Sequence, residues 1–360
     1  MLSTIRDRWG TEVRLVGTHH LPAAIVPAVR WLDEYVELPR HLPPMTEWRT
    51  AIDLASPFVP LFEAWEIDPE LPTIDRADLV AHLAMEVGAH IVVPLADDDV
   101  ADVATYDLSP ARTTTPDPAV VEQLHDRLAL ADLIESLANA PEHLRCPFTQ
   151  SLERATWNRR GVRVRRRNVP TGPPPEGFVT SDGITLTGPA RNAAGRTFVD
   201  EGSFEHHRSR HRLDGPAFDE SLVVQPCLDG PEVVADLWRS RDGDTTIAVF
   251  RERVHPDADT WRVFLDPPME TELARLLGGL DVTGLACARL RPGGAGQLTL
   301  IDLLLRPSDD IALTQATEYD LIGRAIADAL GWPAPRPDAR PPSTDTPLLV
   351  TRSATAVLLG

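Results

Sequence analysis

The stretch Val223–Asp236, with the sequence VVQPCLDGPEVVAD, decides how this protein is interpreted. Two runs rich in valine, Leu222–Gln225 and Val233–Trp238, lie on either side of a segment that contains the turn Gly230–Glu232. Valine favours extended backbone because its branched side chain packs well on a pleated surface, and a Gly-Pro pair is typical of a turn. The stretch therefore predicts two β-strands joined by a turn.

The residues that follow extend this pattern into a sheet with two helices. After a turn at Asp242–Gly243, further strands are expected at Thr246–Phe250, Leu285–Leu290 and Leu298–Leu305. Helices are expected around Glu272–Leu277 and over Tyr319–Leu330, the second of which ends on Gly331. The tail Pro333–Pro347 is proline-rich and expected to be extended, and candidates for an edge strand follow at Leu348–Val350 and Ala356–Leu359.

The first part of the chain alternates predicted strands and helices. In order these are a strand at Glu12–Gly17, a helix from Asp78 to Gly88, a strand at His90–Leu95, a helix that starts at Asp97–Asp99, and one long amphipathic helix from Asp117 to Leu137. This order is typical of a parallel sheet of the mononucleotide-binding type. The segment His41–Pro72, rich in proline and tryptophan, has no clear periodicity and is interpreted as an insertion or a partner-binding arm.

The segment Arg145–Asp214 is rich in glycine, proline and arginine. Asp182–Gly183 lies between two β-prone runs and predicts a hairpin, so a small β-rich lobe is expected here. The run Arg159–Arg167 has two interpretations, a solvated edge strand or a strand that binds phosphate through its guanidinium groups. His206, His207 and His211 alternate with arginines that disfavour Zn²⁺, so this stretch is interpreted as an exposed or anion-binding loop.

Composition excludes several classes of protein. The net charge of −19, from 54 acidic and 35 basic residues, argues against non-specific binding to DNA or RNA. The sequence contains no lysine, which excludes a Walker-type phosphate loop and a pyridoxal-phosphate Schiff base. No apolar run is long enough to cross a bilayer and the start lacks a signal-peptide pattern, so a cytoplasmic protein is expected. The three cysteines are far apart and are expected to be reduced, mostly buried thiols.

Four short motifs, taken in order, resemble those of the ATP-grasp enzymes of the carbamoyl-phosphate-synthetase and amino-acid-ligase type. Val223–Asp236 is similar to the family's hinge strand, V-Q-E-y-i-x-G-x-E-x-x-x-D, and Ile301–Pro307, IDLLLRP, is similar to its metal-binding strand, I-E-x-N-x-R-P. His125–Arg127 lies where the family has an Asp-Lys pair, and Val92–Pro94, followed by acids, resembles the strand that ends the N-terminal lobe. The resemblance spans residues 10–332.

The resemblance implies an α/β protein with an ATP-grasp-like architecture. The expected parts are an N-terminal parallel α/β lobe at residues 1–115, a linker helix and small β-rich lobe at 116–215, a central antiparallel-sheet lobe at 216–332, and a proline-rich tail with an edge strand at 333–360.

The resemblance also implies that ATP is held between the small lobe and the central sheet. The residues that it assigns to ATP are Arg127, Arg165, Arg167, Gln225, Cys227, Leu228 and Glu232. Arg127 replaces the family's phosphate-binding lysine, and the arginines of Arg163–Arg167 are candidates for a second phosphate contact. Pro226 replaces the hinge glutamate and has no backbone N–H to donate.

For Mg²⁺, the resemblance implies Asp302 as a ligand and Arg306 as the catalytic contact to the transferred phosphoryl group. Two positions depart from the family: Leu304 stands in place of an amide ligand, and Arg289 aligns near another oxygen ligand. At about 4 Å and an effective dielectric constant of about 20, unit charges repel by about 4 kcal/mol, and Mg²⁺ would roughly double that energy. An arginine at this position therefore disfavours the metal.

The leading hypothesis is an ATP- and Mg²⁺-dependent carboxylate–amine or carboxylate–thiol ligase of a bacterial biosynthetic pathway, acting through an acyl phosphate. Its partners would be a small carboxylate, an amine or thiol, and a second copy of the chain in a homodimer. The alternative is a catalytically degenerate protein that binds a nucleotide or a partner, and a scaffold without a nucleotide site is a third interpretation. The hypotheses differ in whether Asp302 has a second oxygen ligand within reach.

Overall fold

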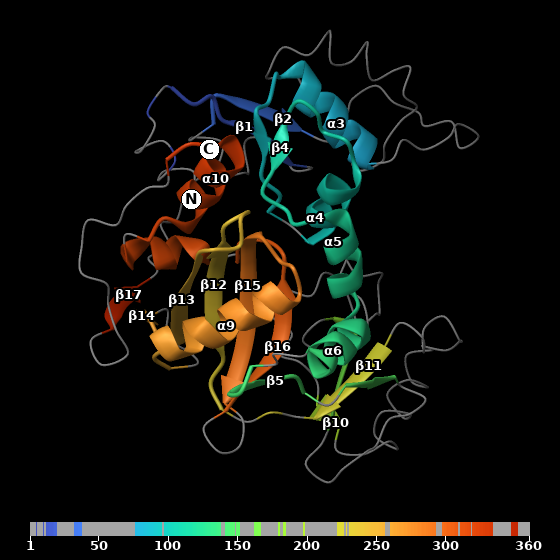
Figure 1. The fold of residues 1–360 in the computed structure, drawn as a ribbon, viewed down its shortest axis with the longest axis vertical. Helices are drawn as coiled ribbons and strands as arrows, with labels where there is room; N and C mark the ends of the chain where they lie inside the picture. The colour runs from blue at the N-terminus through green and yellow to red at the C-terminus, as the bar shows by residue number, and fades with distance from the viewer. Residues whose placement is uncertain are drawn as a thin grey trace, which may run out of the picture. The chain divides into compact units, whose positions relative to one another are not determined.

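The structure is a computed structural model (Figure 1). It describes residues 5, 10, 12–19, 32–37, 76–95, 97–137, 141–147, 149–151, 162–166, 179–180, 183–184, 197–198, 222–226, 228, 230–255, 260–292, 297–308, 310–317, 319–333 and 347–351. The chain forms two compact units. The first contains Met1–Val92, Tyr106–Arg112 and Ser353–Gly360, and the second contains Val93–Thr105 and Thr113–Arg352.

The described part of the first unit has parallel strand pairing, as expected. β1 (Val16–His19) pairs in parallel with β2 (Glu34–Glu37), and α3 (Arg76–Glu86) precedes β3 (Ile91–Val92). β4 (Arg112–Thr113) follows, and the Arg112 backbone N–H donates to His90 O at 2.9 Å. The predicted helix Asp78–Gly88 and strand His90–Leu95 are confirmed with shifted ends.

The second unit is built on a seven-stranded sheet in the order β17-β14-β13-β12-β15-β16-β5. Its strands are β5 (Leu144–Arg145), β12 (Val233–Arg239), β13 (Thr246–Arg253), β14 (Thr260–Phe264), β15 (Gly284–Pro292), β16 (Leu298–Leu304) and β17 (Leu348–Thr351). All neighbours are antiparallel except β16 and β5. The predicted antiparallel sheet and the edge strand at Leu348–Val350 are confirmed, whereas β14 was not predicted.

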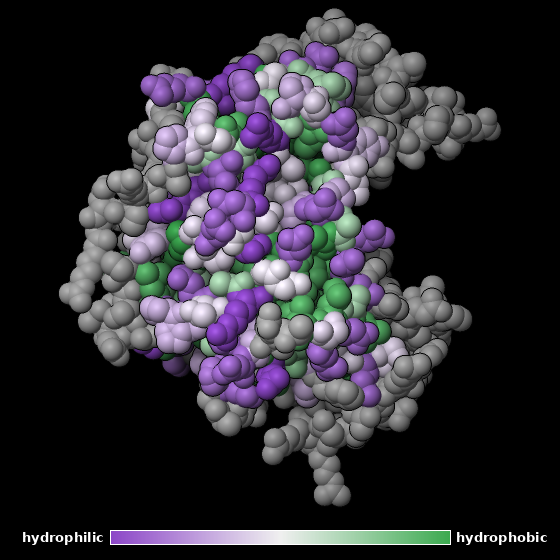
Figure 2. Space-filling model, in the orientation of Figure 1, coloured by the Kyte–Doolittle hydropathy of each residue, from purple (hydrophilic) through white to green (hydrophobic). Residues whose placement is uncertain are grey.

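One face of this sheet forms the hydrophobic core. Val233, Ala235 and Leu237 of β12 alternate along the strand and pack into one buried cluster with α9 (Pro267–Gly279). Figure 1 shows α9 crossing this sheet, and Figure 2 shows that the outer surface of α9 is mostly hydrophilic, with hydrophobic residues gathered beside it over α5 and α6. The other face contacts α10 (Leu321–Leu330) and a 3₁₀ helix, Ile311–Thr317. α10 ends at Gly331, whose φ of 72° suits glycine, as predicted.

The second sheet of this unit has the order β10-β7-β11-β6. Its strands are β6 (Gln150–Ser151), β7 (Val162–Arg166), β10 (Thr197–Phe198) and β11 (Leu222–Pro226), and β8 (Val179–Thr180) pairs with β9 (Gly183–Ile184) as the predicted hairpin. The edge-strand interpretation of the arginine run is wrong, because β7 pairs on one side with β10 and on the other with β11. The small β-rich lobe itself is confirmed.

The single long helix predicted from Asp117 to Leu137 is also wrong. The chain instead forms α4 (Asp97–Thr105), as expected, and then two helices, α5 (Pro118–His125) and α6 (Arg127–Ser136). Asp126 is extended, with φ −92° and ψ 114°, and its carboxylate accepts hydrogen bonds from the backbone N–H groups of Leu128 and Ala129. An aspartate that caps a new helix in this way interrupts the previous one, which periodicity alone does not reveal.

Several predictions lie outside the described residues. These are the segment His41–Pro72, the histidine-rich stretch His206–Arg212, the tail Pro333–Pro347 beyond its two terminal residues, the strand Ala356–Leu359, and the site residues Arg167 and Cys227. The four-part division of the chain stays a prediction. Among the described helices, none is long and apolar enough to cross a bilayer.

Candidate functional site

The face of the large sheet opposite α9 carries a row of charged side chains, which we call the polar face. It is made of Glu232, Asp236, Arg251, Arg289, Arg291 and Asp302. Residues that face one another in antiparallel strands share a face, and the register pairs Val234 with both Arg251 and Arg289, and Arg289 with Asp302. The polar face therefore brings together residues from four strands, β12, β13, β15 and β16.

At the inner end of the polar face, Asp302 is held by two arginines. Arg127 Nε donates to Asp302 Oδ1 at 2.8 Å, and Arg289 Nη1 donates to Asp302 Oδ2 at 3.4 Å. The side chains of Arg127 and Asp302 are only 3% and 2% exposed. The break between α5 and α6 makes Arg127 the first residue of α6. An irregularity in the β15–β16 pairing beside Arg289 leaves Asp302 directly opposite it.

At the outer end, Glu232 holds Arg289 and Arg291. Arg289 Nε and Nη2 donate to the two carboxylate oxygens of Glu232 at 2.9 and 3.0 Å, which is the two-pronged geometry of a strong arginine–carboxylate pair. Arg291 Nη2 lies 3.8 Å from Glu232 Oε2, and Arg291 Nη1 donates to Leu228 O at 3.0 Å. Arg289 thus bridges the two carboxylates.

These residues do not fit a Mg²⁺ site. Mg²⁺ needs several oxygen ligands in octahedral geometry, but both oxygens of Asp302 accept hydrogen bonds from guanidinium groups. Leu304 contributes no oxygen, and Arg289 adds a positive charge within 3.4 Å of the carboxylate. Over the described ranges, no three His, Cys, Asp or Glu side chains are grouped so that they could hold a metal ion. In this structure Asp302, predicted as the metal ligand, is the ion-pair partner of two arginines, and its role as a ligand stays a prediction.

Arg127, predicted as a phosphate contact, donates through Nε to Asp302, a carboxylate 175 positions away in the chain. Its contact with phosphate stays a prediction. For Arg165 the structure describes the backbone, which pairs with Val223, but not the side chain. Whether the arginines of β7 contact phosphate stays a prediction.

Two of the residues predicted to bind ATP, Gln225 and Leu228, lie where β11 leads into β12. Gln225 is buried, and its Nε2 donates to Thr149 Oγ1 at 3.0 Å. Pro226 pairs with Val162 at the end of β11. Leu228 offers its carbonyl to Arg291. Arg306, predicted to contact the phosphoryl group, donates through Nη1 to Pro307 O at 2.9 Å.

Sequence reasoning missed the second ion-pair cluster on the polar face. Arg251 Nε donates to Asp236 Oδ2 at 3.1 Å, Nη2 donates to Ser308 Oγ at 2.6 Å, and Nη1 lies 3.7 Å from Asp310 Oδ2. The guanidinium carbon also lies 5.2 Å from the centre of the Trp261 ring. The sequence did contain a signal for this cluster, because Asp236 is the single acid in the apolar run of β12. A buried carboxylate requires a partner, so a basic residue was to be expected beside it.

The two cysteines that the structure describes are free thiols, as predicted. Cys287 lies on β15 opposite Asp236, and burial first, then the Asp236 carboxylate, raises the pKa of its thiol. Burial also raises the pKa of Cys146 to about 12, and Glu135 and Asp302 add to the rise. Both thiols are therefore protonated at neutral pH and are poor nucleophiles.

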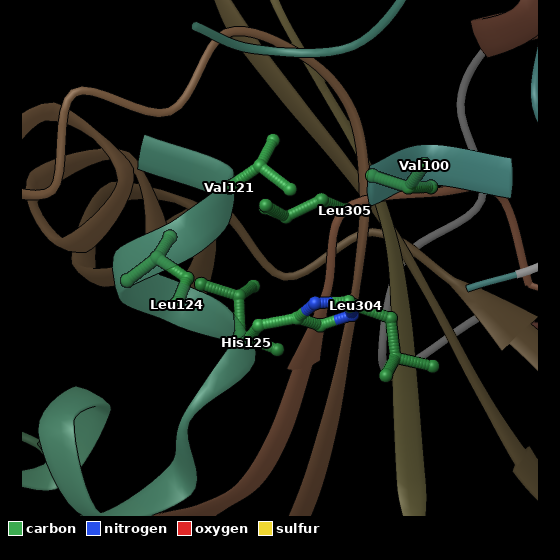
Figure 3. A pocket seen from close by; sticks show the side chains of 7 residues that line it. Val100, Val121, Leu124, His125, Leu304 and Leu305 are labelled. Carbon is green, nitrogen blue, oxygen red and sulfur yellow. The ribbon is translucent and has the colours of Figure 1, made fainter. Parts of the chain in front are cut away.

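A small apolar pocket lies beside the polar face. Figure 3 shows Val100 of α4, Val121, Leu124 and His125 of α5, Leu304 at the end of β16 and Leu305 directly after it around this pocket. It leaves about 10 Å³ for the centre of a water molecule, which is at the lower limit for a single water. Leu304, in the position of the family's amide ligand, thus lines an apolar pocket.

No protein-family model matches the chain, and no curated protein sequence matches it. Solved structures do match. The biotin carboxylase domain of 2-oxoglutarate carboxylase from Hydrogenobacter thermophilus, described as a dimer with MgADP, ADP and bicarbonate, has a TM-score of 0.60 and 12% identity over 96% of this chain and 69% of that chain.

Two other structures show the same likeness. Biotin carboxylase from Campylobacter jejuni, described as a β-γ-ATP complex, has a TM-score of 0.59 and 10% identity over 94% of this chain and 69% of that one. N5-carboxyaminoimidazole ribonucleotide synthetase from Thermotoga maritima has a TM-score of 0.58 and 10% identity over 97% of this chain and 76% of that chain. These are ATP-grasp proteins, and the likeness of the whole chain to them shows that it has the ATP-grasp fold.

Proposed function

We propose that this chain is a catalytically degenerate ATP-grasp protein that binds a nucleotide without Mg²⁺ and acts by recognition rather than by phosphoryl transfer. The observation that carries the proposal is the pairing of Asp302 with Arg127 and Arg289. Two guanidinium groups neutralise the carboxylate that a metal would need. A divalent cation at this position would have to displace arginines that are partly or fully buried, and breaking a buried ion pair is costly.

Nucleotide binding is supported by the fold and by the arginines that surround Asp302 and Glu232. Two of the similar structures are described with adenine nucleotides. The described cluster contains three arginines (Arg127, Arg289 and Arg291) and two carboxylates (Asp302 and Glu232), so its formal charge is positive in a protein whose net charge is −19. A positive site on an acidic protein favours an anionic ligand, and a guanidinium can replace a metal as its counter-charge.

Titration with ATP and ADP in excess chelator tests this proposal. At about 100 times its Kd, a nucleotide should add about 2.7 kcal/mol to the free energy of unfolding, measured as a rise in melting temperature, and Mg²⁺ should not increase the effect. No ATP hydrolysis should be detected in either condition. A flat response to both nucleotides would contradict the proposal, and so would binding that requires Mg²⁺.

A second candidate function is an ATP-dependent ligase that joins a small carboxylate to an amine or a thiol. The observation that favours it is that Arg289 bridges Asp302 and Glu232, which places a second carboxylate near Asp302 that the sequence did not assign to the metal. In this case Arg306 would be the catalytic contact to the phosphoryl group. Mg²⁺-dependent ATP turnover that is lost in Asp302→Asn would favour the ligase.

Rebuilding the family's metal strand is a further test. The double substitution Arg289→Gln with Leu304→Asn removes one positive charge and adds two side-chain oxygens beside Asp302. We expect the variant to gain a Mg²⁺-dependent increase in melting temperature that the wild type lacks, because carbonyl oxygens are suitable ligands for this ion. Leu304→Asn alone is the matched control and should gain little, because Arg289 remains. An equal Mg²⁺ response in the wild type would show that the arginines do not block the site.

The compartment and the assembly stay proposals as well. The Hydrogenobacter domain is described as a dimer, which supports a homodimer of this chain. Light scattering on the purified protein measures the assembly directly.

A further inference from the structure

The polar cluster around Arg289 has a buried end and an exposed end. Arg127 and Asp302, at the inner end, are 3% and 2% exposed, whereas Glu232, Arg289 and Arg291 are 27%, 25% and 22% exposed. A ligand that arrives from solvent therefore meets the outer end first. Freeing the inner pair would leave a buried charge without its partner, which is far more costly than freeing a solvated side chain.

At the outer end, Glu232 occupies the site that an anionic ligand would use. Its two oxygens accept from Arg289 Nε and Nη2 at 2.9 and 3.0 Å. A phosphate or a ligand carboxylate presents two oxygens with the same spacing and pairs with the same edge of a guanidinium. The Glu232 side chain thus resembles, in charge and geometry, the group that the site is suited to bind.

Arg291 supplies independent support for a missing acceptor. Its Nε is buried and has no hydrogen-bond partner, although Nη1 donates to Leu228 O. A buried N–H without an acceptor destabilises the protein, so such groups are rare in folded structures. Arg291 also lies two residues from Arg289 on β15, on the same face of the strand. Because this N–H is buried, the Arg291 side chain would have to shift for an oxyanion between the two arginines to accept a hydrogen bond from it.

Glu232 is also free to move without disturbing the sheet. It precedes β12, which begins at Val233, and it follows Gly230, whose φ of 96° places a turn there. Displacing its carboxylate breaks no strand pairing and returns a side chain that is already 27% exposed to water. Asp302, which lies within β16 and is buried, has no such freedom.

We propose that the Glu232 carboxylate competes with the ligand for Arg289 and Arg291. In the unliganded protein it keeps the two guanidinium groups in place, and a phosphate group of the ligand displaces it on binding. This proposal rests on the proposed function, in which the ligand is a nucleotide. It assigns the phosphate contact to Arg289 and Arg291 rather than to Arg127. Glu232 therefore weakens ligand binding, although the sequence motif suggested that it contributes to it.

The test compares ligand affinities of the wild type, Glu232→Gln, Glu232→Asp and Glu252→Gln by calorimetry in excess chelator. The probes are ATP and inorganic tripolyphosphate. Glu232→Gln should bind both probes about twofold to fivefold more tightly, which corresponds to losing one partly exposed ion pair. Glu232→Asp keeps the negative charge, so its affinity for both probes should stay closer to that of the wild type. Glu252→Gln removes a carboxylate that pairs with Arg262 elsewhere on the sheet and should change nothing.

The outcomes separate this inference from the proposed function. Weaker or unchanged binding in Glu232→Gln overturns the inference, even where the wild type binds ATP. Tighter binding of tripolyphosphate, with no preference for ATP over it, supports the inference and contradicts the nucleotide proposal. The melting temperature of each variant, measured without ligand, shows whether the fold is intact, and Glu232→Asp supplies a second comparison if Glu232→Gln is unstable.

Discussion

Asp302→Ala is expected to lower the free energy of unfolding by about 3–5 kcal/mol, because it leaves the buried guanidinium of Arg127 without the carboxylate that neutralises it. Urea denaturation monitored by circular dichroism measures the loss. The size of this effect bears on function as well as on stability. A carboxylate kept for a metal ion contributes little to folding without that ion, and active-site residues are often replaced with no loss of stability.

Two variants control this measurement. Arg127→Met should cost less than Asp302→Ala, because Asp302 then keeps its contact with Arg289 at 3.4 Å. Glu252→Ala, which removes a carboxylate from a partly exposed ion pair with Arg262, should change the free energy of unfolding by less than about 1 kcal/mol. If Asp302→Ala is no less stable than the wild type, the ion pair does not hold the fold, and the ligase hypothesis gains support.

Arg251→Met is expected to cost a similar amount, about 3–5 kcal/mol, because Asp236 is completely buried and loses its partner. One oxygen of Asp236 already has no hydrogen-bond partner, so the carboxylate depends on Arg251 for its neutralisation. Adding Asp236→Val to Arg251→Met should restore most of the lost stability, since apolar residues often replace a buried ion pair without a net loss. The same urea measurement gives both values.

The recovery in the double variant is the decisive part of this second experiment. A double variant as unstable as Arg251→Met alone would show that Arg251 acts mainly through Ser308 and Asp310, which lie just after β16. Asp236→Val alone is the matched single variant. It should be as destabilised as Arg251→Met, because it leaves a guanidinium that is only 3% exposed with fewer acceptors.

Most of the central sheet was predictable from the sequence. Successive residues of a valine-rich run such as Val233–Trp238 point to opposite faces of a strand. The turn residues on either side of the run limit its length, which agrees with the observed strand Val233–Arg239. The end of α10 was predictable for a local reason, since Gly331 adopts a positive φ. The break at Asp126 was not predicted, because an aspartate inside an amphipathic pattern reads equally well as an exposed helical residue.

The neighbours of the strand that carries the arginine run were also not predictable from the sequence. Val162–Arg166 was recognised as β-prone, but whether it lies at an edge depends on β10 and β11, which come later in the chain. Sequence patterns describe which residues share a face of one strand. They do not give the neighbours of that strand, because pairing partners are fixed by the packing of the whole sheet.

The sequence by itself determined the α/β class, most strands of the central sheet and the ATP-grasp likeness, because periodicity and turn residues act over a few positions. It also identified the residues of the candidate site: Arg127, Glu232, Arg289 and Asp302 were all named from motifs. Only the tertiary structure decided what these residues do to one another. Arg127 and Asp302 lie 175 positions apart, and the fold brings them within 2.8 Å, where opposite charges removed from water must pair.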